Sequence, residues 1–83
     1  MYVRQVTAHF KPEKFDMLNK KFEEDVIPML RKQTGFRDEL SIFDRNKDEA
    51  ITMSFWDTKQ AAEKYAREVY PVVHKKMEGT LED

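Results

Sequence analysis

The sequence contains no cysteine, and its 83 residues include only two glycines, three prolines, two histidines and one tryptophan. The lack of cysteine excludes a disulfide framework, an iron–sulfur cluster and a thiolate zinc site. Two glycines are too few for a glycine-rich phosphate loop, and two histidines are too few for a three-histidine metal site within one chain. We therefore expect no bound metal.

Neither sign of charge dominates, since 15 Lys and Arg residues face 16 Asp and Glu residues, for a net charge of −1. Without surplus cations to neutralise phosphates, nucleic acid is not an expected partner. The apolar runs are a few residues long, against the roughly 20 needed to span a bilayer. The N-terminus also lacks the apolar core of a secretion signal. We expect no membrane partner and a cytoplasmic location.

The composition that remains is typical of a folded domain with a charged shell. Hydrophobic residues make up 40% of the chain, aromatic residues 12% and charged residues 37%. Disordered chains are poor in aromatic residues, so disorder is not expected here. The length allows one domain, and we expect it to span residues 1–83.

The first third of the chain predicts a strand followed by a helix. Residues 2–10 are rich in β-branched and aromatic side chains, although parity alone does not decide which face is buried. Pro12 suits the first turn of a helix. Pro28 is expected to kink this helix without ending it, and Gly35 is expected at its C-terminal cap. The helix is predicted from apolar residues that recur every three or four positions: Phe15, Leu18, Phe22, Val26 and Leu30.

The middle of the chain predicts a β-hairpin. Residues 36–45 and 50–56 have strand composition, and the turn-forming residues 46–48 join them. No linker or internal repeat interrupts this part of the sequence.

The last third predicts a second, interrupted helix. Asp57 is the expected N-cap, with Gln60 three residues later as in a capping box. Pro71 is expected to interrupt the helix, and a second helical piece over 72–77 is expected to end at Gly79.

The resulting order β-α-β-β-α predicts an α+β domain with a ferredoxin-like fold, in which the complete pattern is β-α-β-β-α-β. The last strand would begin near residues 80–83, so we expect it to be absent or very short. Two helices cover one face of such a sheet, and its other face would leave Val, Met and Ile side chains in water. We therefore expect a homodimer.

Three segments resemble the antibiotic biosynthesis monooxygenase-like family. They are PMLR at 28–31, GF at 35–36 and FWDTKQAAEKY at 55–65, within a resemblance that covers roughly residues 3–77. The resemblance implies a dimeric α+β barrel, in which two ferredoxin-like sheets pack face to face. It also implies a substrate cavity between the sheet and the helices of each protomer.

The resemblance implies three catalytic candidates. Trp56 matches a pocket tryptophan, with a plain core position at the junction of sheet and helix as the alternative. His74 matches the segment of an axial haem ligand with a one-residue difference in length, and the alternative is an exposed histidine on a solvated face. Gln5 matches an asparagine on the first strand of the haem-degrading members.

Four further residues are expected to contact a substrate. Tyr65 and Tyr70 could belong to the polar set that binds the phenol in the quinone-forming members. His9 shares the strand face of Gln5 and is expected at the cavity mouth, and Phe22 is expected in the cavity wall.

These residues suggest three functions. The first is a cofactor-independent monooxygenase-like activity on an aromatic or phenolic small molecule, in which the protein desolvates the substrate and holds its anion. The second is haem binding and degradation with His74 as ligand. The third is a small dimeric binding module without catalysis.

Overall fold

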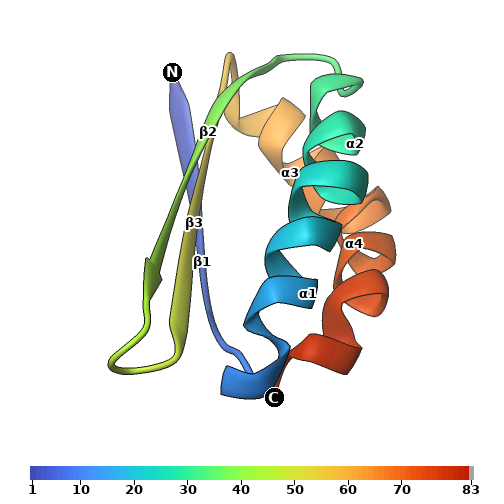
Figure 1. Ribbon diagram of the computed structural model, residues 1–83. Helices are drawn as coiled ribbons and strands as arrows, with labels where there is room; N and C mark the ends of the chain where they lie inside the picture. The colour runs from blue at the N-terminus through green and yellow to red at the C-terminus, as the bar shows by residue number, and fades with distance from the viewer. Residues whose placement is uncertain (83) are drawn as a thin grey trace.

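The structure, a computed structural model, describes residues 1–82 as a sheet covered on one face by helices (Figure 1). The strands are antiparallel and lie in the order β1-β3-β2. The fold class expected from the sequence, α+β with the ferredoxin-like order β-α-β-β-α, is confirmed. The strands span Tyr2–His9 (β1), Phe36–Asp44 (β2) and Glu49–Trp56 (β3).

The helices form two groups that pack on the same face of the sheet (Figure 1). None of those in the described residues is long and apolar enough to cross a membrane. The first group is η1 (Pro12–Lys14), α1 (Phe15–Lys21), η2 (Phe22–Val26) and α2 (Ile27–Arg31). The second group is α3 (Lys59–Glu68), α4 (Tyr70–Met77) and η3 (Glu78–Thr80).

The fourth strand of the ferredoxin-like pattern is reduced to one bridge within residues 1–82. Leu81 pairs with Phe10 in antiparallel fashion just beyond the end of β1. The Lys11 N–H donates to the Thr80 carbonyl and the Glu82 N–H to the His9 carbonyl, each at 2.9 Å. The expectation of an absent or very short last strand is confirmed.

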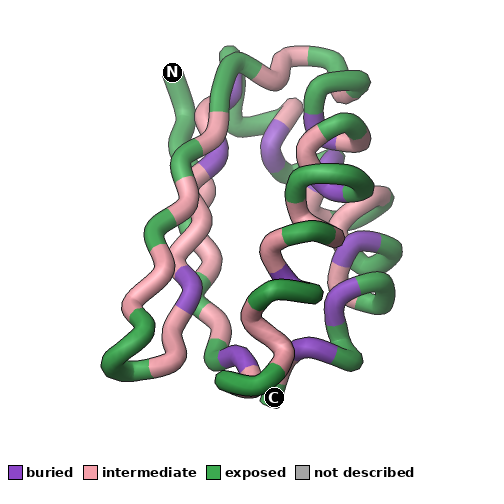
Figure 2. Tube along the Cα trace, viewed as in Figure 1, coloured by how far each residue is buried: buried purple, intermediate pink, exposed green. Residues whose placement is uncertain are grey.

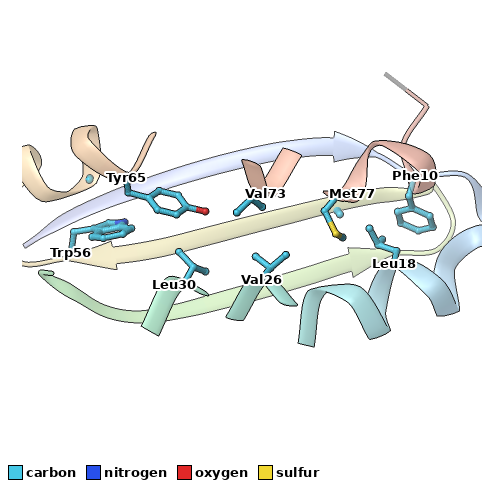
Figure 3. Close-up of a cluster of buried hydrophobic side chains, with 10 residues drawn as sticks. Phe10, Leu18, Val26, Leu30, Trp56, Tyr65, Val73 and Met77 are labelled. Carbon is cyan, nitrogen blue, oxygen red and sulfur yellow. The ribbon is translucent and has the colours of Figure 1, made fainter. Parts of the chain in front are cut away.

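The core lies between the sheet and the helices, and the buried residues gather there (Figure 2). Phe10 and Trp56 are fully buried at its two ends, with mostly aliphatic side chains between them (Figure 3). The buried residues labelled in the close-up are Phe10, Leu18, Val26, Leu30, Trp56, Tyr65, Val73 and Met77.

The two faces of the sheet differ in the size of their side chains. The face toward the helices carries small or polar residues along β3, namely Ala50, Thr52 and Ser54. The opposite face carries the larger apolar residues Ile51, Met53 and Phe55, together with the half-exposed residues Val3, Leu40 and Ile42. Successive side chains of a strand point to opposite faces, so the even-numbered residues of β3 face the helices and the odd-numbered residues face the open side.

Pro28 is accommodated by a wider helical turn. Pro28 has no N–H to donate to the Glu24 carbonyl, and the residues before it form the π-helical segment η2. Within this segment the Ile27 N–H donates to the Phe22 carbonyl, five residues back. The helix therefore passes the proline and continues as α2, as the sequence predicted.

Two expected caps are wrong in detail. Thr58, not Asp57, caps α3, since its Oγ1 accepts from the Ala61 N–H at 3.1 Å. Gly35 is not the cap of the first helix, which ends at Arg31. It lies in the turn before β2 with φ of +84°, and a Cβ there would be 2.7 Å from the Ala61 Cβ.

Candidate functional site

A cavity of about 90 Å³ lies between the inner face of β1 and β3 and the covering helices. Its wall is mostly apolar, with contributions from α1, η2, α2 and α4. One end is polar and brings together Arg4, Tyr65, Tyr70 and His74. An apolar chamber with a few convergent polar groups is the common form of a small-molecule site.

The cavity exists because the sheet presents small side chains to the helices. Ala8 on β1 and Ala50 and Ser54 on β3 line its floor, where larger residues would fill the space. On the helical side, Val26 and Val73 are buried in its wall. Most protein interiors leave few voids larger than a water molecule, so a chamber of this size is a specific feature of the packing.

Arg4 reaches the polar end of the cavity from β1. Its guanidinium carbon lies 4.4 Å from the centre of the Tyr70 ring and 5.6 Å from that of Tyr65. Both distances are within the range of cation–π attraction. Among residues 1–82, no carboxylate forms an ion pair with Arg4, and no hydrogen bond of its guanidinium is present. Within the part of the chain that the structure describes, the partly buried charge faces the aromatic rings of Tyr65 and Tyr70.

Tyr65 projects from α3 over the sheet, with its hydroxyl toward the centre of the core (Figure 3). The residue is 4% exposed overall, and no buried polar side-chain atom among the described residues lacks a hydrogen-bond partner, so the Tyr65 oxygen is accessible from the cavity that it lines. Burial raises the pKa of Tyr65 to about 12, with the Arg4 charge opposing the shift and Tyr70 adding to it. The hydroxyl therefore keeps its proton at neutral pH and is available as a donor to a bound molecule.

Tyr70 and His74 lie one turn apart on α4, and both line the cavity. Their ring centres are 6.1 Å apart, and both side chains are half-buried. The spacing i, i+4 places them on one face of the helix. This places the His74 imidazole beside the Tyr70 ring, whose other neighbour is Tyr65 at 6.4 Å between ring centres.

Trp56 lies outside the cavity, contrary to the pocket position that the resemblance implied. It is fully buried, and its Nε1–H donates to the Ser54 Oγ at 2.8 Å. Its ring packs against Phe36 at 5.5 Å and against Tyr65 at 5.1 Å between ring centres. Trp56 is therefore the core residue that the alternative interpretation expected. Its ring packs against the Tyr65 ring from outside the cavity.

Gln5 and His9 also lie outside the cavity, on the open face of the sheet. Gln5 is exposed and pairs across the strands with Met53, while His9 pairs with Glu49. The His9 Nε2 is 3.3 Å from the Glu49 Oε2. The expected cavity positions of both residues are wrong because the inner face of β1 carries the even-numbered residues.

Phe22, Tyr65, Tyr70 and His74 do line the cavity, and their roles toward a substrate stay predictions. The sequence analysis did not assign Arg4 to the site. The missed signal is parity, since Arg4 shares its strand face with the cavity-lining Val6 and Ala8.

The cavity residues do not fit a haem group. The space of about 90 Å³ is smaller than the roughly 150 Å³ of a cavity that holds benzene, whereas a porphyrin contains four pyrrole rings. Within residues 1–82, no group of three His, Asp or Glu side chains is placed to hold a metal ion.

Comparison with solved structures relates this fold to two other proteins. A "putative antibiotic biosynthesis monooxygenase" from Nitrosomonas europaea superposes with a TM-score of 0.76 at 14% identity, over 100% of this chain and 88% of its own. A protein of the same description from Bacteroides thetaiotaomicron VPI-5482 gives a TM-score of 0.72 at 12% identity, over 98% and 79%. The resemblance to the monooxygenase-like family is thus confirmed at the level of the fold. No family model and no curated protein matches the sequence.

Proposed function

We propose that this chain is a cofactor-independent monooxygenase-like protein that acts on a small phenolic molecule held in the cavity. The observation that carries the proposal is that the Tyr65 hydroxyl and the His74 imidazole belong to the lining of one mostly apolar chamber. The fold shared with two proteins described as monooxygenases supports the reaction class.

In this reaction the substrate itself reduces oxygen. A dihydroxybenzene and O2 give a hydroxyquinone and water, so one oxygen atom enters the ring and the other leaves as water. The ring supplies all four electrons, and no flavin or metal is required for the balance. The protein needs to favour the phenolate, which is the electron-rich form of the substrate, and to keep it dry.

Two side chains have the chemistry for this task. A neutral His74 imidazole accepts the phenol proton, and Tyr65, which stays protonated because of its raised pKa, donates a hydrogen bond to the resulting phenolate. The apolar wall formed by residues such as Phe22 and Val26 excludes water from the reacting ring.

Oxygen consumption with hydroquinone tests the proposal. Purified protein treated with a chelator is expected to consume one O2 per hydroxyquinone formed, above the rate of a blank without protein. His74→Ala is expected to lower the rate by about 100-fold or more, the usual contribution of a general base. His9→Gln is the matched control, because this histidine lies on the opposite face of the sheet. Equal rates for His74→Ala and wild type would contradict the proposal.

We also propose that the open face of the sheet packs against a second copy of this chain. The face carries apolar side chains on all three strands, and Val3, Leu40 and Ile42 are each about half exposed. Such a contiguous apolar surface is uncommon on a monomer. A self-complementary sheet contact would cover these residues in both copies at once.

A further inference from the structure

Arg4 is the one side chain among the cavity-lining residues that carries a permanent charge, and nothing in the described chain neutralises it. Among residues 1–82, no aspartate or glutamate belongs to that lining. A guanidinium offers five N–H donors, and leaving them without acceptors in a partly buried place is unfavourable. The described lining offers hydroxyl and imidazole groups but no anionic group, so the guanidinium there has no counter-charge.

Arg4 also lies where the cavity meets the surface. It lines a separate shallow groove with Tyr2, Ala62, Glu63 and Ala66, between the free edge of β1 and α3. The acidic member of this groove, Glu63, lies 3.7 Å from the Lys59 Nζ and forms no ion pair with Arg4. A ligand that enters beside β1 therefore meets the guanidinium before it reaches the apolar chamber.

The size of the chamber limits the apolar part of any ligand whose charged group lies at Arg4. A space of about 90 Å³ is smaller than the roughly 150 Å³ cavity that holds benzene, so it encloses only part of a single ring, and the rest of the ring extends out of the chamber toward Arg4. A fused system of two or three rings exceeds it.

We propose that the cavity selects a one-ring molecule bearing one anionic oxygen group, a carboxylate or a phenolate, with that group held by Arg4 and the Tyr65 hydroxyl. The inference deepens the proposed function by naming its substrate class, and it rests on that function for the claim that the bound molecule is oxidised. The pairing is a charge-assisted hydrogen bond on a cation that forms no ion pair within residues 1–82.

Equilibrium binding, measured by calorimetry and by NMR shifts of the cavity residues, tests the proposal without turnover. Benzoate and para-nitrophenolate represent the two anionic groups, benzamide is the neutral counterpart of benzoate, and naphthoate is the larger anion. We expect benzoate and para-nitrophenolate each to bind at least about tenfold more tightly than benzamide, the usual value of a hydrogen bond to a charged group. We expect naphthoate to bind more weakly than benzoate.

A matched pair of variants assigns the effect to Arg4. Arg4→Gln is expected to remove the preference for benzoate over benzamide. Arg45→Gln is expected to retain it, because the Arg45 guanidinium also lies over an aromatic ring, 4.0 Å from the centre of Phe15, but outside the cavity lining. The comparison of benzoate with benzamide on wild-type protein decides the matter even if Arg4→Gln does not fold.

Equal affinities for benzoate and benzamide, tighter binding of naphthoate, or no binding of any of these molecules would overturn the inference. Anion-selective binding without oxygen consumption would leave it standing and refute the proposed function. Oxygen consumption that is insensitive to Arg4→Gln would refute this inference and leave the proposed function standing.

Discussion

Arg4 and Gln5 are neighbours in the sequence and lie on opposite faces of the sheet. Arg4 lines the cavity, whereas Gln5 lies on the open face of the sheet. The even-numbered face of β1 continues into Phe10, which is fully buried, and this large aromatic residue fixes the orientation of the strand. At the scale of single residues, the site is thus determined by which of two alternating faces has the better anchor.

Gly35 is the residue whose backbone and surroundings both require glycine. We expect Gly35→Ala to lower the free energy of unfolding by about 1–3 kcal/mol, because its φ is +84° and the new Cβ would be 2.7 Å from the Ala61 Cβ. Denaturant unfolding measures the change. Gly79→Ala is the control and is expected to change stability by less than about 0.5 kcal/mol, since no atom lies within 4 Å of a Cβ there. Equal effects at the two positions would contradict this account.

At the scale of elements, the first helix shows why a proline can lie inside a buried stripe. Leu18, Phe22, Val26 and Leu30 are spaced by four residues, and a regular α-helix would rotate each by about 40° from the last. The wider turn of η2 opposes this drift, so that all four side chains line the cavity. The same segment also accommodates Pro28, which has no N–H to donate to a carbonyl of the preceding turn.

The start of α3 depends on a side-chain cap. We expect Thr58→Ala to destabilise the protein by about 1 kcal/mol, because the Ala61 N–H loses its acceptor. Thr58→Ser keeps a hydroxyl in the same place and is expected to stay within a few tenths of the wild-type value. Unfolding curves of the three proteins measure the difference. A wild-type midpoint for Thr58→Ala would assign the cap to another residue.

At the scale of the whole molecule, both faces of the sheet carry apolar side chains, but the helices cover only one of them. The inner face is covered by the helices, whereas the outer face exposes apolar side chains from all three strands. One face of β3 therefore lines the cavity, and the other face belongs to the proposed contact between copies.

If two copies associate through this face, thermal stability depends on concentration. Each tenfold dilution lowers the stability of a dimer by about 1.4 kcal/mol. With the unfolding entropy of two chains of this length, the expected decrease in Tm is about 4 °C. Calorimetry and analytical ultracentrifugation over a range of concentrations measure both quantities.

Ile42→Glu is expected to abolish the dependence of Tm on concentration and to yield a monomer, because it places a charge within the apolar face. Val72→Glu on α4 is the control, since Val72 is 49% exposed, nearly the same as Ile42 at 48%, but lies on a helix. A Tm that is independent of concentration in the wild-type protein would contradict the proposed dimer.

The order of elements could be predicted from the sequence because its signals are local. Periodic apolar residues, the prolines at 12 and 71 and the turn at 46–48 act within a few positions of themselves. Part of the site was also predictable, since Phe22, Tyr65, Tyr70 and His74 do line the cavity.

The sequence by itself thus determined the strands, the helices and the chemistry available to them, because these depend on neighbouring side chains along the chain. Only the tertiary structure decided which face of each strand meets the helices. That choice moved Gln5 and His9 out of the cavity, brought Arg4 into it and placed Trp56 behind Tyr65. The physical reason is that a strand has two faces of equal geometry, and packing against distant helices selects between them.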